Sequence, residues 1–404
     1  MRVPKNELAS AAAEARRWSP AVALWLLAFG LHTFDWGYGV VRALLLLAVA
    51  AIAFTGLWWS RREEARPPNR PPRPGLVVIV VLLTLSHPAL MAARHVSGHP
   101  GGLSDLGTTT LAAAHSLERG ENPYAAPIDS VAAAALGPAY SGYKYLPVTP
   151  LLYAPLGLPL GEVGILLTNL ALDAVVVVLV FLAARRLGGG EAGLVAAAIY
   201  LSLPEIAPLL AGGVTELAAV TPLLASLLLV DRRPGISGLL VGLSLSCKPL
   251  PALAALPACL PQRGRVAFGL GVAIGLTPTV LAFVAGPRAF FDNIVAFNFV
   301  RPTDSTSWMA GLPPTAHVIA QLAFGAVWLA LAAVALRSTN APGMRFPLVV
   351  LLVTAVLLAG PAIHQNYDLW WAPFIAVATA LGVAREDRRA ASPSSILSSV
   401  APPH

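Results

Sequence analysis

Charged residues are scarce in this sequence. Only 12% of its 404 residues are Asp, Glu, Lys or Arg, against about 25% in an average soluble domain, and the mean hydropathy is +0.71. Cysteine is scarcer still: Cys247 and Cys259 both lie in apolar sequence, which favours buried, inert thiols over a disulfide or a metal site. The composition therefore excludes an ordinary soluble domain and a disulfide-stabilised scaffold.

Long apolar stretches are abundant instead. A helix needs roughly 20 mostly apolar residues to cross a bilayer, and Pro74–Ala93, Gly161–Ala184 and Thr315–Leu336 all qualify. They lack strict alternation, so helices are favoured over a barrel. The sequence predicts an all-α, polytopic transmembrane bundle of about 10–12 spans. The first of these is interpreted as a retained span, not a cleaved signal.

The basic clusters give the topology, because cytoplasmic loops carry the excess of Lys and Arg. Placing the clusters inside puts both termini in the cytoplasm and leaves two long external loops, 94–145 and 286–314. Charge then marks orientation and contact with anionic membrane lipids, so a net charge of +7 does not indicate nucleic acid. The clusters are the N-terminus, Arg61–Arg73, Arg185–Arg186, Arg232–Arg233, Arg263–Arg265, Arg337–Arg345 and Arg385–Arg389.

Three regions are predicted along the chain. Residues 1–74 hold an N-terminal segment, an additional helical hairpin and a basic, Pro-rich loop. Residues 75–389 form the membrane core, and residues 390–404 form a polar tail that reads as disordered. Because no soluble domain is large enough to hold an active site, function is expected in the membrane and its external loops.

The first external loop carries the most information. Ser104 and Asp105 precede a helical run that ends near Glu118, with Gly120 as its stop. Asn122-Pro-Tyr124 follows, and the loop returns through Tyr143-Lys144-Tyr145-Leu146-Pro147. Prolines and aromatics at a membrane boundary are typical of a re-entrant segment or an interfacial belt.

These motifs, with Cys247-Lys248-Pro249 further on, resemble glycosyltransferase family 87 over roughly residues 94–370. That family belongs to the C-type superfamily of integral-membrane glycosyltransferases. Leu146 departs from it, since the family often has a second proline there. The resemblance implies a C-type fold in the bacterial cytoplasmic membrane, with the active site on its external face. It also implies inverting transfer of a hexose, most simply mannose, from a polyprenyl-phosphate-sugar to an envelope glycolipid or polysaccharide.

Asp105 occupies the position of the family's catalytic base, and it is equally suited to cap the helix. The donor's leaving group is a phosphate, so cations are needed more than a strong acid. Lys, Arg or a divalent cation (Mg²⁺ or Mn²⁺) would serve, although the sequence shows no metal-ligand set. The residues expected to contact substrate or phosphate are Asn122, Tyr124, Lys144, Tyr145, Lys248, Arg301, His364 and Tyr367.

Each of these has an ordinary alternative. Lys248 would snorkel to the outer interface, and Lys144, Arg301 and the His364–Asp368 turn would face water. Asp173 is expected to make a structural hydrogen bond inside a span. Glu205 and Glu216 read as solvated turn residues or as support for an ion or acceptor.

Other functions also stay open at this point. An arabinofuranosyltransferase of the same family uses the same motifs. A lipid or sugar transporter or flippase would predict inverted repeats and midplane polar residues, and the sequence shows no clear repeat. Trp370 and Trp371 are expected to be interface anchors.

Overall fold

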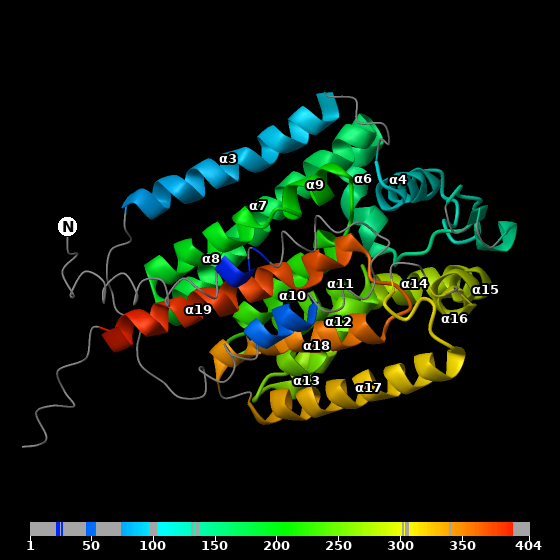
Figure 1. The fold of residues 1–404 in the computed structure, drawn as a ribbon. Helices are drawn as coiled ribbons and strands as arrows, with labels where there is room; N and C mark the ends of the chain where they lie inside the picture. The colour runs from blue at the N-terminus through cyan, green and yellow to red at the C-terminus, as the bar shows by residue number, and fades with distance from the viewer. Residues whose placement is uncertain are drawn as a thin grey trace, which may run out of the picture.

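The computed structural model describes residues 22–24, 26, 46–53, 74–96, 103–130, 133–134, 137–300, 303, 307–338 and 341–390. Most of the first two predicted spans and the tail from 391 lie outside these residues. Every regular element among those described is helical (Figure 1). The elements are α3 (Pro74–Val96), α4 (Asp105–Glu118), η1 (Pro138–Tyr140), α6 (Val148–Leu160), α7 (Glu162–Gly188), α8 (Gly190–Ser202), α9 (Ile206–Ala211), α10 (Leu217–Leu229), α11 (Pro234–Leu245), α12 (Pro249–Cys259), α13 (Arg265–Gly275), α14 (Thr277–Ala285), α15 (Pro287–Phe290), η2 (Phe291–Ala296), α16 (Phe297–Val300), α17 (Pro314–Arg337), η3 (Pro342–Met344), α18 (Arg345–Ala359), η4 (Gln365–Trp370) and α19 (Ala372–Ala390).

Five helical segments in the described part of the chain are long and apolar enough to cross a membrane: Pro74–Ala93, Glu162–Gly188, Arg265–Ala285, Pro314–Arg337 and Pro342–Ala359. Six further apolar helices are shorter, between 10 and 17 residues. At 1.5 Å per residue, a 13-residue helix covers only about 20 Å of a roughly 30 Å hydrocarbon core. An all-helical bundle with membrane-length helices is therefore confirmed, while the count of 10–12 full spans stays a prediction.

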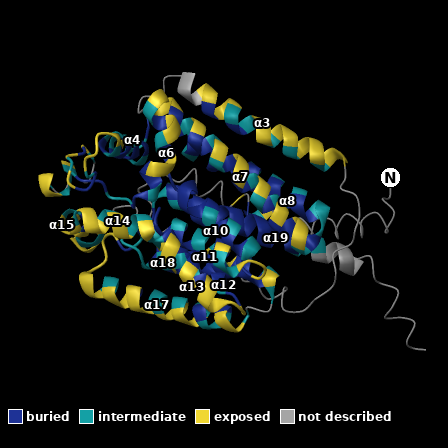
Figure 2. Ribbon diagram, turned by 180° about the vertical axis from the view of Figure 1, so that it is seen from behind, coloured by how far each residue is buried: buried dark blue, intermediate teal, exposed yellow. Residues whose placement is uncertain are grey.

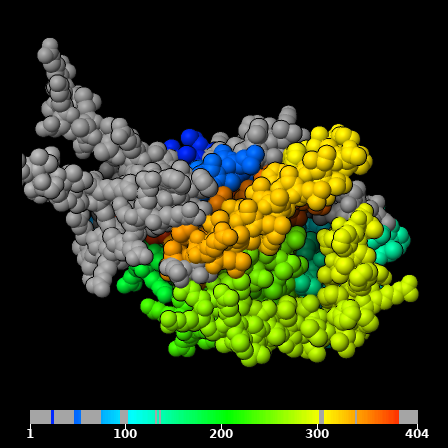
Figure 3. Space-filling view, turned by 90° about the horizontal axis from the view of Figure 1, so that it is seen from below, coloured from blue at the N-terminus to red at the C-terminus, as the bar shows by residue number. Residues whose placement is uncertain are grey.

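Several of the short helices lie at the centre of the bundle. Figure 2 shows α10 and α19 as largely buried and α3 and α17 as largely exposed. Among the long helices, 78% of the α18 span is buried, against 11% for α3 and 17% for α17. Viewed from below in Figure 3, α17 crosses the surface beside the chain from α13 to α16. The exposed apolar faces of α3, α13 and α17 are what lipid would cover.

Helices α11 and α13 cross at backbone contact. A Cβ added at Gly238 or Gly242 would overlap the carbonyl oxygens of Phe268 and Val272 on α13. The contact is reciprocal, because a Cβ at Gly271 or Gly275 would overlap carbonyl oxygens of α11. Small residues four apart on both helices are the usual way for two membrane helices to approach closely.

A buried polar contact ties α3 to the bundle. Asp173 on α7 accepts a hydrogen bond from the Tyr200 hydroxyl at 2.8 Å, and its other oxygen lies 2.8 Å from Nδ1 of His87. Nε2 of His87 lies 3.0 Å from the carbonyl oxygen of Leu201, so this nitrogen is the donor. The structural hydrogen bond expected of Asp173 is present.

The two ends of the bundle differ in character (Figure 1). One end, here called the α4 end, carries α4, α14, α15 and α16. The opposite end, here called the basic end, carries Arg185 and Arg186 at the end of α7 and Arg232 just after α10. The positive-inside rule predicts that the basic end faces the cytoplasm.

Candidate functional site

A buried charged cluster forms where two of the short helices begin. Glu216 directly precedes α10 and Lys248 directly precedes α12. Because these helices are too short to span the bundle, their first residues lie within the protein and not at a surface. Glu216 is 0% exposed and Lys248 is 6% exposed. Glu216 as a solvated turn residue and Lys248 as a snorkelling side chain are therefore wrong.

Glu216 is the centre of this cluster. Its Oε1 accepts hydrogen bonds from the Lys248 ammonium and, at 2.5 Å, from the side-chain amide of Asn366 on η4. Its Oε2 is buried and has no hydrogen-bond partner among the described residues. A buried carboxylate needs a paired cation and further donors to offset its desolvation. Here one oxygen is satisfied twice and the other can still accept a hydrogen bond.

The loop between α4 and α6 covers this cluster through Tyr145. The ring centroid of Tyr145 lies 4.7 Å from Nζ of Lys248, a cation–π contact. The backbone beside it pairs with the segment before α12, since Leu146 N–H donates to the Cys247 carbonyl (3.3 Å) and Val148 N–H to that of Ser246 (3.1 Å). The sequence motifs around Tyr145 and Lys248 are thus in direct contact.

Asp105 lies beside the chain that leads to Glu216. It begins α4 and is half-buried, while Ser104 takes the N-cap position without a side-chain capping bond. Ser104 N–H donates to the Gly212 carbonyl at 2.6 Å, four residues before Glu216. Asp105 is therefore not the helix cap, and its place in the first turn still suits a carboxylate, which the helix dipole favours there.

Gly107 permits this close approach of α4. A Cβ at this position would lie 2.8 Å from the Gly213 carbonyl oxygen and 3.2 Å from the Leu103 side chain. We expect Gly107→Ala to lower the stability of the folded protein by about 1–3 kcal/mol through this overpacking. Thermal unfolding of the purified protein in detergent measures the loss. Gly325→Ala is the control, because nothing lies within 4 Å of its added Cβ; an equal effect of both would contradict the packing argument.

A second cluster surrounds Lys144. Its ammonium donates to the Asn293 side-chain oxygen and lies 5.4 Å and 5.2 Å from the ring centroids of Tyr140 and Phe297. Asn293 in turn donates to the Tyr124 carbonyl at 2.8 Å. Partial burial lowers the pKa of Lys144 to about 8. This lysine joins the loop between α4 and α6 to η2.

Asn122 and Tyr124 support the loop. The side-chain oxygen of Asn122 accepts from Tyr124 N–H at 3.0 Å, which closes a turn. The buried Tyr124 ring packs edge-on against Phe290 with centroids 5.0 Å apart, and its hydroxyl donates to the Tyr145 carbonyl. Burial raises the pKa of Tyr124. Tyr124 thereby holds the peptide of Tyr145, whose ring covers Lys248.

The turn that contains His364 and Tyr367 forms η4. The Tyr367 ring stacks on Trp370 at 4.4 Å and meets the His364 ring edge-on at 5.4 Å. Trp370 and Trp371 are 3% and 0% exposed, so the prediction that they are interface anchors is wrong. They are buried because η4, which leads into α19, packs against α10. This turn contributes Asn366 to the Glu216 cluster.

The structure brings together some of the predicted residues. Tyr145 covers Lys248, which pairs with Glu216, whereas Lys144 and Tyr124 meet at Asn293. Asn122 adjoins Tyr124 and His364 adjoins Tyr367, while Asp105 lies beside the chain that leads to Glu216. Arg301 lies outside the described residues. Sequence reasoning missed Asn293, Asn366 and the burial of Glu216; the available signal was an acid and a base at the starts of two unusually short apolar helices.

No set of three or more His, Cys, Asp or Glu side chains suited to a metal occurs in the described part of the chain. Cys247 and Cys259 are both buried and unpaired, as predicted. No protein-family model matches the chain, and no curated protein matches it in sequence.

Proposed function

We propose that this protein is an integral-membrane glycosyltransferase that takes a sugar, with mannose the first candidate, from a polyprenyl-phosphate donor. The observation that carries the proposal is the buried Glu216–Lys248–Asn366 cluster beneath Tyr145. Ionisable groups inside a membrane bundle are costly and by default mark a functional site. The loop that covers this cluster is the one that begins with Asp105.

The proposed reaction is a single displacement at the anomeric carbon. Asp105 removes the proton of the acceptor hydroxyl, the oxygen attacks the anomeric carbon, and the bond from that carbon to the phosphate oxygen breaks. The polyprenyl phosphate leaves with the electron pair, and the configuration inverts. Lys248 and Lys144 supply positive charge for the phosphate. Glu216 holds the Lys248 ammonium in place until the phosphate arrives.

The first test is transfer in membranes that contain the protein. Radiolabelled polyprenyl-phosphate mannose and polyprenyl-phosphate arabinofuranose are supplied separately, with an envelope lipid and polysaccharide extract as acceptor. Incorporation of label from one donor, absent in membranes without the protein, supports the proposal and names the sugar. Label that stays wholly on polyprenyl phosphate with both donors contradicts it.

Lys144 gives the proposed reaction a pH dependence. Its pKa is lowered to about 8 by partial burial, so the charged form is lost as the pH rises through 8. We expect KM for the donor to rise by about tenfold per pH unit above pH 8. The pKa of about 8 is that of Lys144 in the protein without a bound donor. Lys144→Arg keeps its charge at any such pH and should flatten the profile. A wild-type KM that is constant from pH 7 to 10 would exclude this role.

A further inference from the structure

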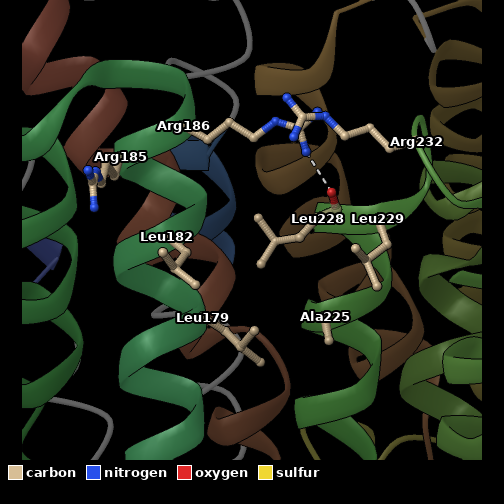
Figure 4. Close-up of a pocket in the computed structure, with 8 residues that line it drawn as sticks. All are labelled: Leu179, Leu182, Arg185, Arg186, Ala225, Leu228, Leu229 and Arg232. Carbon is tan, nitrogen blue, oxygen red and sulfur yellow. Dashed lines mark hydrogen bonds between the residues drawn. The ribbon is translucent and has the colours of Figure 1, made fainter. Parts of the chain in front are cut away.

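A pocket opens between α7 and α10 at the basic end, far from the Glu216 cluster in the fold. Its volume is about 530 Å³, within the range of small-molecule sites. Figure 4 shows that its two halves differ: leucines of both helices form a wall, and arginines lie above it. The lining residues are Leu179, Leu182, Arg185, Arg186, Ala225, Leu228, Leu229 and Arg232.

Two guanidinium groups point toward one another across the mouth of this pocket. In Figure 4 the side chains of Arg186 and Arg232 extend from opposite sides and approach each other. Arg186 Nη1 donates to the Leu228 carbonyl at 2.6 Å, which fixes its position. Arg185 turns away and lies 5.8 Å from the ring centroid of Phe181.

No carboxylate in the described part of the chain forms an ion pair with Arg186 or Arg232. Asp231 is near enough to attract Arg186, but its ion pair is with Arg345 on α18, at 2.7 Å. Two like charges held together repel unless an anion lies between them, and guanidinium groups suit phosphate oxygens. An anionic group at the mouth of the pocket would relieve this repulsion.

The apolar wall decides what kind of anion fits. Leu182 is 42% exposed, and with Leu179 and Leu228 it continues the pocket down between the helices toward the bundle centre. A soluble phosphate would leave this wall in water, whereas an acyl chain would cover it. Basic pockets between membrane helices on the cytoplasmic side are suited to anionic headgroups.

We propose that this pocket binds one anionic phospholipid of the leaflet at the basic end. Its phosphodiester lies between Arg186 and Arg232, and an acyl chain lies along the leucine wall. This site is independent of sugar transfer, because it is at the opposite end of the bundle from Asp105. It would hold the ends of α7 and α10 together.

The test uses the full chain purified in detergent and native mass spectrometry. Phosphatidylglycerol and phosphatidylcholine with identical acyl chains are added separately, and glycerol phosphate serves as the soluble anion. We expect one retained phosphatidylglycerol per chain and little phosphatidylcholine. Arg186→Gln with Arg232→Gln should weaken phosphatidylglycerol binding about 30-fold, the effect of two lost surface charges.

The control removes equal charge elsewhere: Arg263→Gln with Arg337→Gln changes two exposed arginines and should alter binding less than twofold. Leu182→Trp keeps both arginines and fills the apolar half of the pocket, so it should also weaken phosphatidylglycerol binding. It replaces the Arg186→Gln, Arg232→Gln variant in the test if that variant does not fold. Equal retention of both lipids, or unchanged binding in both pocket variants, would overturn the proposal. Glycerol phosphate binding as tightly as phosphatidylglycerol would assign the pocket to a soluble anion.

Discussion

Asp105→Asn is expected to lower the rate of sugar transfer by about 10²–10⁴-fold, the usual contribution of a general base. The amide keeps the size of the carboxylate but cannot take the acceptor proton. Equal amounts of the variant and the wild type in the membranes would show that the change leaves folding intact. Initial rates at saturating donor, in membranes with equal amounts of protein, measure the effect. KM for the donor should change little, since the base acts on the acceptor.

Glu118→Gln is the matched control for this experiment. Glu118 lies at the other end of α4 and is exposed, and its carboxylate lies 3.3 Å from Nδ1 of His115. It should keep full activity. If Asp105→Asn transfers sugar as fast as the wild type, the base is another residue; the buried carboxylate of Glu216 would then be the next one to change.

Lys248→Met is expected to destabilise the protein by about 3–5 kcal/mol, because it leaves the buried Glu216 carboxylate without its cation. Glu216→Met should cost a similar amount for the converse reason. Changing both residues to Met removes the ion pair altogether and should restore most of the lost stability. The remaining loss comes from the Asn366 amide, which then has no Glu216 acceptor. Denaturant unfolding of the purified variants in detergent measures all three.

Lys144→Met provides the comparison, because its partner is the neutral amide of Asn293. We expect Lys144→Met to destabilise the protein by about 1 kcal/mol. Activity separates the two roles of Lys248: the double Met variant should fold yet transfer no sugar. A double variant that folds and is fully active would show that the buried pair serves neither the donor nor the acceptor.

The helical architecture could be predicted from apolar length and charge alone. The apolar runs Pro74–Ala93 and Gly161–Ala184 carry little charge, and the structure has membrane-length helices at Pro74–Ala93 and Glu162–Gly188. The helix that begins at Asp105 was equally predictable. It ends at Glu118, and Gly120 follows with the positive φ that is typical of a helix stop. These features depend on local sequence, which is why the sequence reveals them.

The Glu216 cluster could not be predicted, because its three members are far apart in the chain. Apolar composition does not reveal that α10 and α12 are short helices that begin inside the bundle. If each had been a full span, Glu216 and Lys248 would lie in surface turns, as the sequence suggested. Trp370 and Trp371 were misassigned for the same reason: η4 is a buried turn.

The glycine crossing of α11 and α13 limits what mutation can explore in this protein. At Gly238, Gly242, Gly271 and Gly275 every other amino acid would collide with a main-chain oxygen, and no compensating change in a side chain can move a backbone. In a saturation library these positions should stand out as intolerant sites four apart on each helix. Lys248 lies three residues after the end of α11. The position of Lys248 therefore depends on four glycines that have no reactive side chain.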